Sequence, residues 1–428
     1  MVLVAAQLLL GGVVLDDGPA RPPVSAADRG RAGLDLRDDA LVAREAAVRV
    51  LLDERGAAVR ARDREAFLDT VDPQAVAFLA RQAALFDALG DVPLDGWEYV
   101  LDPTSERPRD PALDRRHGRG WWAPHVGLRY RLTDYDDQPT VEEQALTLVP
   151  RADGWKVAAD DDFDAVGVRT TRGLWDAGPV VTVQRPGVLV LGHPGNGRLL
   201  REVARTVQAA VPRVSRLWGE DWSQRVVVLV PATDLELASV VPGDGDLTQI
   251  AAVATAEAAV EPGGLPVGDR VVVNPSTFLR LGAVGRRVVL THEVAHVATR
   301  AATGPQAPAW LVEGFADHVG YLGTDVPLRV GARDLRAAVR DGRLPETLPP
   351  DDAFDGASPD LAQAYEQAWS AVALLVERYG PERVVELYRT VGRAQTEDEV
   401  EQAFDEQLGT STAAFTRVWR ASLARRLR

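Results

Sequence analysis

The chain has 428 residues, a net charge of −15 at pH 7 and no cysteine. Because a single hydrophobic core seldom grows beyond about 250–300 residues, this length predicts more than one domain. The acidic balance, with Lys156 as the only lysine, argues against nucleic acid as a partner. The lack of cysteine excludes disulfides, thiolate metal ligands, a cysteine nucleophile and a lipid-modified cysteine anchor.

Residues 1–16 are mostly apolar and end at an acidic pair, Asp16 and Asp17. This run is too short to span a bilayer, and no basic residue precedes it, so we interpret it as a truncated signal or membrane-type segment. Residues 17–40, rich in Pro, Gly, Ala and charge, are predicted to be a flexible linker. We therefore expect an extracytoplasmic protein, secreted or attached to a membrane through its N-terminus. The alternative for the apolar run is a helix of an intracellular protein.

Residues 41–166 carry helical patterns first and strand patterns afterwards. Apolar residues recur at helical spacing over Leu41–Arg62 and Gln74–Leu89. Alternating or β-branched runs then predict strands at Trp97–Leu101, Val126–Leu132, Glu142–Val149 and Trp155–Ala159. This order of elements resembles the nuclear-transport-factor-2-like (NTF2-like) cone, which implies an accessory domain of helices and an antiparallel sheet.

Two neighbouring tryptophans, Trp121 and Trp122, stand close to His125 in this module. Paired aromatics beside a histidine suit a small-molecule pocket. A hydrophobic plug that fills the cone explains the same residues and is the favoured interpretation.

The segment His292-Glu293-Val294-Ala295-His296 places two histidines four positions apart. On a helix they lie one turn apart on the same side, so both rings can reach a single cation. Glu293 can contact a water held by that cation, which is the arrangement of HExxH zinc peptidases with glutamate as the general base. A pair of hydrogen-bonded core histidines is the alternative.

A third candidate ligand, Glu313, follows His296 by 17 residues. The turn-forming stretch Thr303–Pro308 separates the histidines from a second predicted helix, Ala309–Tyr321, which would return Glu313 to them. Two histidines and a glutamate leave the fourth position of a catalytic zinc open for water. Asp317, one turn further along, is placed to accept the free ring N–H of a ligating histidine. An ordinary acidic pair on a helix surface is the alternative.

These two motifs, His292–His296 and Pro308–Asp317, resemble gluzincin zinc metallopeptidases, specifically peptidase MA-like domains. The resemblance covers residues 180–428 and implies a zincin-like domain with a mixed sheet and a helical lower lobe. It also implies one zinc ion and a peptide or protein substrate. The residues that it assigns are the ligands His292, His296 and Glu313, the base Glu293 and the supporting Asp317. The spacer after His296 is shorter than in thermolysin-like relatives, so the shape of the substrate cleft stays open.

Peptide hydrolysis also needs a hydrogen-bond donor for the developing oxyanion. The resemblance favours Tyr365, because related enzymes take a tyrosine from a helix beyond the third ligand; His318 and Tyr321 are further candidates. Zincins place an edge strand before the metal helix, which implies that residues 270–274 pair with substrate and that Asn274 binds its backbone. A buried side chain that only packs is the alternative for the tyrosines, and an ordinary edge strand closed by Pro275 is the alternative for residues 270–274.

The sequence therefore predicts an α+β protein with an NTF2-like domain at 41–166 and a zincin-like domain at 180–428. Its predicted function is zinc-dependent peptide hydrolysis. The alternative is a catalytically silent zincin-like protein that binds or regulates partners at the cell envelope. Retention of Glu293 and of all three ligands favours the enzyme.

Overall fold

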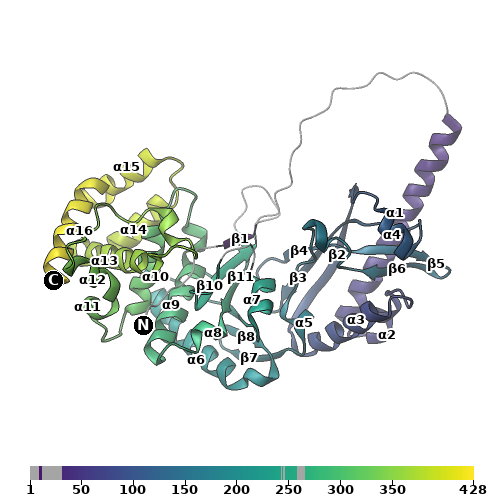
Figure 1. Ribbon diagram of the computed structural model, residues 1–428, viewed down its shortest axis with the longest axis horizontal. Helices are drawn as coiled ribbons and strands as arrows, with labels where there is room; N and C mark the ends of the chain where they lie inside the picture. The colour runs from purple at the N-terminus through teal and green to yellow at the C-terminus, as the bar shows by residue number, and fades with distance from the viewer. Residues whose placement is uncertain (1–8, 12–30, 242, 244–245, 258–265) are drawn as a thin grey trace. The chain divides into compact units, whose positions relative to one another are not determined.

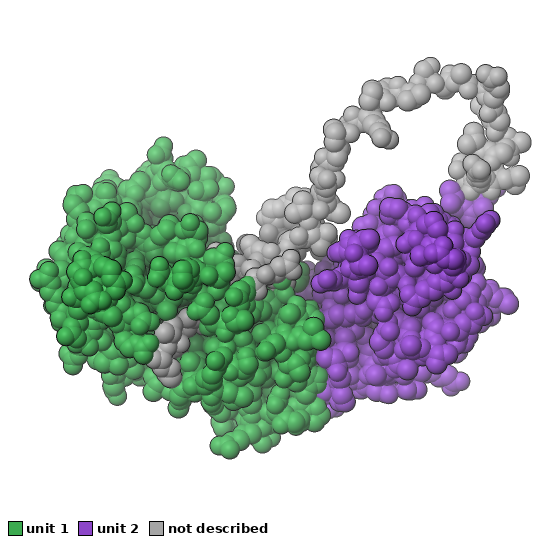
Figure 2. Space-filling view, in the orientation of Figure 1, with its two compact units in different colours: residues 1–11, 181–259, 263–428 green, residues 12–180, 260–262 purple. Residues whose placement is uncertain are grey.

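The computed structural model describes residues 9–11, 31–241, 243, 246–257 and 266–428, with side chains from residue 39 onward. The chain divides into two compact units, shown in different colours in Figure 2. Unit 1 comprises residues 1–11, 181–259 and 263–428, and unit 2 comprises residues 12–180 and 260–262. Helices combine with two small antiparallel sheets and one mixed sheet, so the predicted α+β class is confirmed.

The N-terminal predictions lie mostly outside the described residues. Within residues 1–16, only Leu9–Gly11 is described, as strand β1. Helix α1 begins at Arg31, so residues 31–40 are helical and the predicted linker is wrong over that part. The stretch from Arg31 has no proline and is dominated by Ala, Leu, Arg and Asp, of which the first three are strong helix formers. Among the helices that the structure describes, none is long and apolar enough to cross a membrane.

Unit 2 combines long helices with two small antiparallel sheets (Figure 1). One sheet has the order β2-β3-β4 and the other pairs β5 with β6. Its helices are α1 (Arg31–Ala61), α2 (Arg64–Asp69), α3 (Val76–Ala88), α4 (Pro111–His117) and α5 (Leu174–Ala177). Its strands are β2 (Leu94–Glu106), β3 (Pro124–Leu132), β4 (Thr140–Gln144), β5 (Thr147–Arg151) and β6 (Gly154–Ala159).

The predicted strand Glu142–Val149 is divided in the structure. Its first part is the end of β4 and pairs with β3, whereas its second part begins β5 and pairs with β6. Ala145 and Leu146 separate the two strands, and the amide of Ala145 donates to the Thr170 hydroxyl instead of to a neighbouring strand. The segment 142–149 contains no Gly, Pro, Asn or Asp, so its sequence did not indicate this change of sheet. The NTF2-like assignment of this unit stays a prediction.

Trp121 and Trp122 are buried in two different hydrophobic clusters of unit 2. Trp122 packs with Val48 and Leu148, and its indole N–H donates to Glu106. Trp121 packs with Phe163 in the second cluster. Both rings fill the interior, as the plug interpretation predicted.

Unit 1 is built on a six-stranded mixed sheet with the order β1-β10-β11-β9-β8-β7. The central pairs β11/β9 and β9/β8 are parallel, while β10/β11 and β7/β8 are antiparallel. The strands are β7 (Val181–Arg185), β8 (Val188–Gly192), β9 (Val226–Val230), β10 (Ala252–Glu257) and β11 (Val267–Val273). A mixed sheet was predicted for this domain.

Strand β11 is an interior strand of this sheet, so the prediction that residues 270–274 form a substrate-pairing edge is wrong. It pairs with β10 on one side and with β9 on the other. Val272 and Val273 are fully buried. Lateral order in a sheet is set by contacts between distant segments, and the position of a strand along the chain does not reveal it.

Helices make up the remainder of unit 1, and the C-terminal ones form the lobe seen in yellow-green in Figure 1. The two that carry the HExxH motif and Glu313, α9 and α10, pack on each other, and α10 also packs on α13. The longer helices are α6 (Gly197–Trp218), α9 (Ala283–Thr299), α10 (Ala309–Tyr321), α12 (Arg333–Arg340), α13 (Leu361–Tyr379), α14 (Pro381–Val391), α15 (Glu397–Leu408) and α16 (Thr412–Arg426).

Two glycines allow α10 to lie close to its neighbours. A Cβ atom at Gly314 would collide with the Ala368 carbonyl oxygen of α13, and one at Gly320 would stand 2.9 Å from the Val288 carbonyl oxygen of α9. Backbones approach this closely only where no side chain intervenes. Gly314 therefore lets α13, which carries Tyr365, pack directly beside Glu313.

Candidate metal centre

Helix α9 holds both motif histidines in the interior of unit 1. Every residue from Val288 to Thr299 is buried. His292 and His296 lie one turn apart, with ring centroids separated by 4.6 Å and Nε2 atoms by 2.8 Å. Neither side chain exposes more than 1 % of its surface. Two ring nitrogens thus face the same point.

Helix α10 brings Glu313 to that point. Its bounds, Ala309–Tyr321, are those predicted, and residues 303–308 connect it to α9 without regular structure. The Glu313 Oε2 atom lies 3.2 Å from His292 Nε2 and 3.3 Å from His296 Nε2. These three residues form a buried group whose ligand atoms all lie within 4.8 Å of one another.

Asp317 orients the first histidine. His292 Nδ1 donates to Asp317 Oδ1 at 2.9 Å, one helical turn beyond Glu313. A histidine that donates from Nδ1 directs the lone pair of Nε2 toward the other side of the ring. That side faces Glu313 and His296, so the contact presents His292 as a ligand. The corresponding Nδ1 of His296 has no hydrogen-bond partner among the described residues.

The acidic groups of the cluster have strongly shifted pKa values. Burial raises the pKa of Glu313, but the attraction of the adjacent His296 and His292 outweighs it and lowers the pKa to about 2. Burial, reinforced by the nearby Glu313 charge, raises the pKa of Glu293 to about 8 despite the attraction of His292. Burial also raises the pKa of Asp317, against the attraction of His292. Several carboxylates therefore share one dry region with few cations.

The cluster fits a metal ion on the evidence of its unsatisfied atoms. Glu313 Oε2 lies within 3.3 Å of both rings, yet it accepts no hydrogen bond with acceptable geometry. Ligands that bind tetrahedral zinc at ~2.0–2.2 Å are separated from one another by roughly 3.3–3.5 Å. The observed separations of 2.8–3.3 Å approach that value. Two imidazoles and one carboxylate are also a donor set that zinc prefers.

Glu293 is fully buried beside the first histidine. Neither of its carboxylate oxygens accepts a hydrogen bond of good geometry from the described residues, and the backbone of Ala254 is the donor that acts on it. A buried carboxylate without donors is destabilising unless something else compensates it. Glu293 lies next to the three-ligand cluster. A cation held there, or a water bound to that cation, would compensate its buried charge.

Tyr365 of α13 reaches the same region. Its ring centroid lies 6.1 Å from that of His292, and Phe354 packs edge-on against its other side at 5.2 Å. The hydroxyl is buried near the Glu313 carboxylate and makes no hydrogen bond of good geometry with the described residues. Burial, together with the charges of Glu313, Asp317 and Glu293, raises the pKa of Tyr365 well above its ordinary value. Its hydroxyl therefore stays protonated and can act as a donor.

The structure does not bring the remaining predicted residues into the cluster. Asn274 caps the short helix α8 (Pro275–Phe278): its side-chain oxygen accepts from the amides of Ser276 and Thr277, and its amide donates to Leu247. The side chain of Asn274, which was predicted to bind substrate, is thus hydrogen-bonded within the protein. No described contact links His318 to the three ligands, and burial alone lowers the pKa of His318 to about 4. Tyr321 stacks on Trp369 at 3.9 Å.

Two features of the site were not predicted from the sequence. Arg300, just after α9, is buried and paired with Asp269, and its charge adds to the lowering of the His296 pKa that burial causes. The Gly314 contact with α13 is the second. The Glu-Gly pair of α10 is visible in the sequence and could have indicated it, whereas nothing local indicates the Arg300–Asp269 pair.

Comparisons with known proteins give weak similarity. No protein-family model and no curated protein matches the chain. Among solved structures, an M1 zinc metallopeptidase from Deinococcus radiodurans is similar at 18 % identity and a TM-score of 0.35, covering 65 % of this chain and 59 % of that one. A two-domain M1 zinc metallopeptidase mutant bound to L-arginine is similar at 15 % identity and a TM-score of 0.33, over 64 % and 58 %. The chain thus spans less than two thirds of these structures. At this level the likeness assigns no activity, and the chemistry is read from the side chains.

Proposed function

We propose that this protein is a zinc-dependent peptidase. The observation that carries the proposal is the convergence of His292, His296 and Glu313 in a buried group, with the carboxylate of Glu293 beside them. His292, His296 and Glu313 would hold the zinc, and Asp317 would keep His292 in its ligating orientation. Zinc held by three protein ligands lowers the pKa of a bound water to about 7 and polarises a carbonyl group.

Glu293 would act as the general base. It takes a proton from the attacking water while the water oxygen bonds to the carbonyl carbon of the peptide. The same carboxyl group then gives that proton to the nitrogen of the leaving amine as the C–N bond breaks. A base with a pKa raised toward neutrality by burial suits both transfers.

Tyr365 would donate a hydrogen bond to the oxygen on which negative charge develops. Its hydroxyl makes no hydrogen bond of good geometry with the described residues, and its raised pKa keeps the proton in place. A donor aimed at such an oxygen is typically worth about 3 kcal/mol in transition-state stabilisation.

The test combines metal analysis with a peptide-library digest read by mass spectrometry. The wild-type protein is expected to bind one zinc and to cleave peptides, and chelation should abolish cleavage. Glu293→Gln should keep the zinc but lose activity by roughly 10²–10⁴-fold. His296→Ala should lose both. Stoichiometric zinc with no cleavage by the wild type would establish instead the silent binding or regulatory protein, and absence of zinc binding would refute the metal centre.

We further propose that the protein acts outside the cytoplasm, secreted or attached to a membrane through its N-terminal segment. The apolar character of residues 1–16 supports this proposal. Cell fractionation of the full-length product provides the test, and recovery from the cytosol alone would contradict it.

A further inference from the structure

Strand β10 (Ala252–Glu257) lies between the rest of the sheet of unit 1 and the N-terminal strand β1 (Leu9–Gly11). On one side it pairs antiparallel with β11, and on the other side it pairs in parallel with β1 (Figure 1). Helix α9, which carries Glu293, packs on β10. The side of β10 that faces away from β11 is called its outer edge here, and β1 is the described strand that covers it.

The backbone groups of β10 alternate between its two edges. The Asn274 amide donates to the Ala251 carbonyl oxygen, so Ala251 directs its backbone groups toward β11. In an antiparallel pair every second residue does the same, and the residues between them direct their N–H and C=O groups to the opposite side. Ala252 and Ala254 pair with Val273 and Val271 at such intermediate positions. Their backbone groups therefore point to the outer edge.

The outer edge of β10 lies beside the candidate metal centre. The backbone of Ala254 is the donor that acts on the Glu293 carboxylate. A peptide held along this edge would thus bring its main chain to the proposed general base. Extended peptides commonly bind in this way, by adding a strand to a sheet edge through main-chain hydrogen bonds.

Strand β1 occupies the same edge immediately after Ala254. Leu9 pairs with Thr255, Leu10 with Ala256, and Gly11 with Glu257. Paired strands lie about 4.8 Å apart, so two strands cannot occupy one edge at the same place. Residues 1–11 and β10 belong to the same compact unit, so this contact lies within unit 1. A substrate and β1 would compete for the outer edge.

We propose that Leu9–Gly11 is an autoinhibitory strand, which covers the edge of β10 that a peptide substrate needs in order to reach Glu293 and the zinc. This inference rests on the proposed peptidase function. A strand of three residues is at the short end of the usual range, so it detaches part of the time and the full chain keeps measurable cleavage. Only the detached fraction binds substrate. The strand therefore raises the apparent KM by the ratio of covered to open edge and leaves kcat unchanged.

The first test locks β1 in place with a disulfide in the full chain. Leu10→Cys combined with Ala256→Cys joins two residues that are opposite each other in the register, and the natural chain has no cysteine that could interfere. Mass spectrometry should show the disulfide, and the oxidised protein should cleave peptides at least tenfold more slowly than the same protein reduced with a phosphine. The matched control is Leu10→Cys with Ala252→Cys. Ala252 lies about 13 Å from Ala256 along the strand, too far for a disulfide to Leu10, so this pair should stay reduced.

The second test removes the strand. Deletion of residues 1–11 should lower the KM for peptide cleavage about tenfold, with kcat and zinc content unchanged. Deletion of residues 1–8 keeps β1 and should behave as the full chain. If the shortened chain fails to fold, the cross-linked variant decides.

The outcomes separate this inference from the proposed function. Cleavage that is equally fast in the oxidised and reduced protein, no disulfide between positions 10 and 256, or an unchanged KM after deletion of residues 1–11 would each overturn the autoinhibitory strand alone. Bound zinc without cleavage by the full, reduced or shortened chain would instead refute the peptidase, and the inference with it.

Discussion

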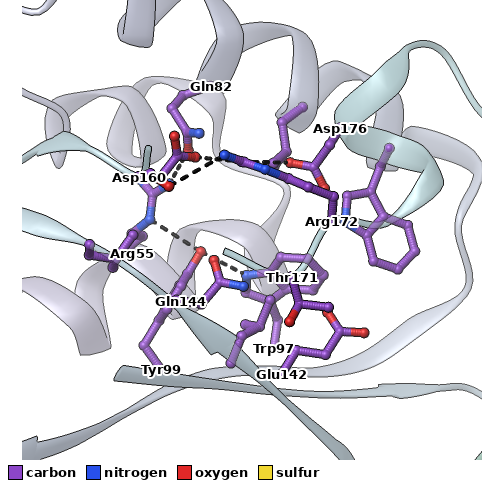
Figure 3. Close-up of a pocket in the computed structure, with 14 residues that line it drawn as sticks. Arg55, Gln82, Trp97, Tyr99, Glu142, Gln144, Asp160, Thr171, Arg172 and Asp176 are labelled. Atoms are coloured by element: carbon purple, nitrogen blue, oxygen red, sulfur yellow. Dashed lines mark hydrogen bonds and ion pairs between the residues drawn. The ribbon is translucent and has the colours of Figure 1, made fainter. Parts of the chain in front are cut away.

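The candidate metal centre of unit 1 and a pocket of unit 2 both gather ionisable side chains, but they balance the charges differently. The pocket is lined by Arg55, Arg172, Glu142, Asp160 and Asp176 (Figure 3). Around His292 and His296, the carboxylates of Glu293, Glu313 and Asp317 outnumber the available cations. In the pocket, Arg172 pairs with Asp160 and Asp176. Arg55 donates to the neutral side chains of Tyr99, Thr70 and Gln82. Buried charges are paired or neutralised in folded proteins, so the surplus of carboxylates around the two histidines identifies a cation as the ligand that would balance it.

The largest effect expected from this comparison is zinc stabilisation of unit 1 alone. A ligand that binds only the folded state stabilises it by about 4 kcal/mol at a thousandfold excess over its dissociation constant. Calorimetry of the full chain should therefore show that zinc raises the unfolding transition of unit 1 by several degrees. The transition of unit 2 should not move.

His296→Ala is the matched variant for this experiment. It removes one ligand from the cluster and should abolish the zinc-dependent shift. Two results would show that the buried cluster of unit 1 is not a metal site. In the first, zinc raises the two transitions equally; in the second, it raises the unit 1 transition in the variant as much as in the wild type.

The next effect concerns the donor of the cluster, Tyr365. Tyr365→Phe should lower kcat for peptide cleavage about 100-fold and leave KM and zinc content nearly unchanged. Folding should be unaffected, because the hydroxyl makes no hydrogen bond of good geometry with the described residues. Steady-state kinetics would check this. Tyr321→Phe, which alters a tyrosine stacked on Trp369, is the control, and equal losses in both variants would contradict a specific role.

Asp317→Asn tests whether the carboxylate beside His292 matters through the histidine. The hydrogen bond from His292 Nδ1 would remain with a weaker, neutral acceptor, so zinc affinity should fall by roughly 10–100-fold without a change in stoichiometry. Competition with a chromophoric chelator measures the affinity. Asp334→Asn, on the surface of α12, is the matched control. An unchanged zinc affinity in Asp317→Asn would show that the contact between Asp317 and His292 does not support metal binding.

The cluster of the candidate metal centre could be predicted from the sequence, because its residues are placed by local geometry. The four-residue spacing of His292 and His296 sets both on one face of a helix, and Asp317 repeats that step after Glu313. A single turn, residues 303–308, was enough to fold α10 back on α9. Short-range rules therefore determined four side chains of one site.

The hydrogen bonds of the buried Arg55 and the strand order could not be predicted in this way. The partners of Arg55 are Tyr99 in β2, Gln82 in α3 and Thr70 just after α2, 15 to 44 positions away, and no periodicity links them. The interior position of β11 likewise depends on its two neighbours. Strand β9 is distant in sequence and pairs in parallel, and β10 pairs antiparallel. Contacts of this kind depend on how whole elements pack. The sequence pattern of an element does not indicate which element will lie beside it.

A buried carboxylate outside both sites offers a contrast with the carboxylates of the candidate metal centre, because backbone amides donate hydrogen bonds to it. Glu366 of α13 is 8 % exposed and accepts from the amides of Leu335 at 2.6 Å and Asp334 at 3.3 Å, at the start of α12. Burial raises its pKa to about 7, although these amides act in the opposite direction. No ligand is needed there, since the helix start supplies the donors.

The sign of its pH dependence follows from that shift. Between an unfolded-state pKa of about 4.3 and the folded value of about 7, the folded protein keeps a proton on Glu366 that the unfolded chain has lost. Stability therefore falls as the pH rises through this window, by about 1–3 kcal/mol. Glu366→Gln is neutral at every pH and keeps an oxygen for the Leu335 amide, so urea unfolding at pH 5 and pH 8 should show a smaller loss. Glu377→Gln, half exposed on the same helix, should behave as the wild type, and parallel losses in all three proteins would assign the pH dependence to other groups.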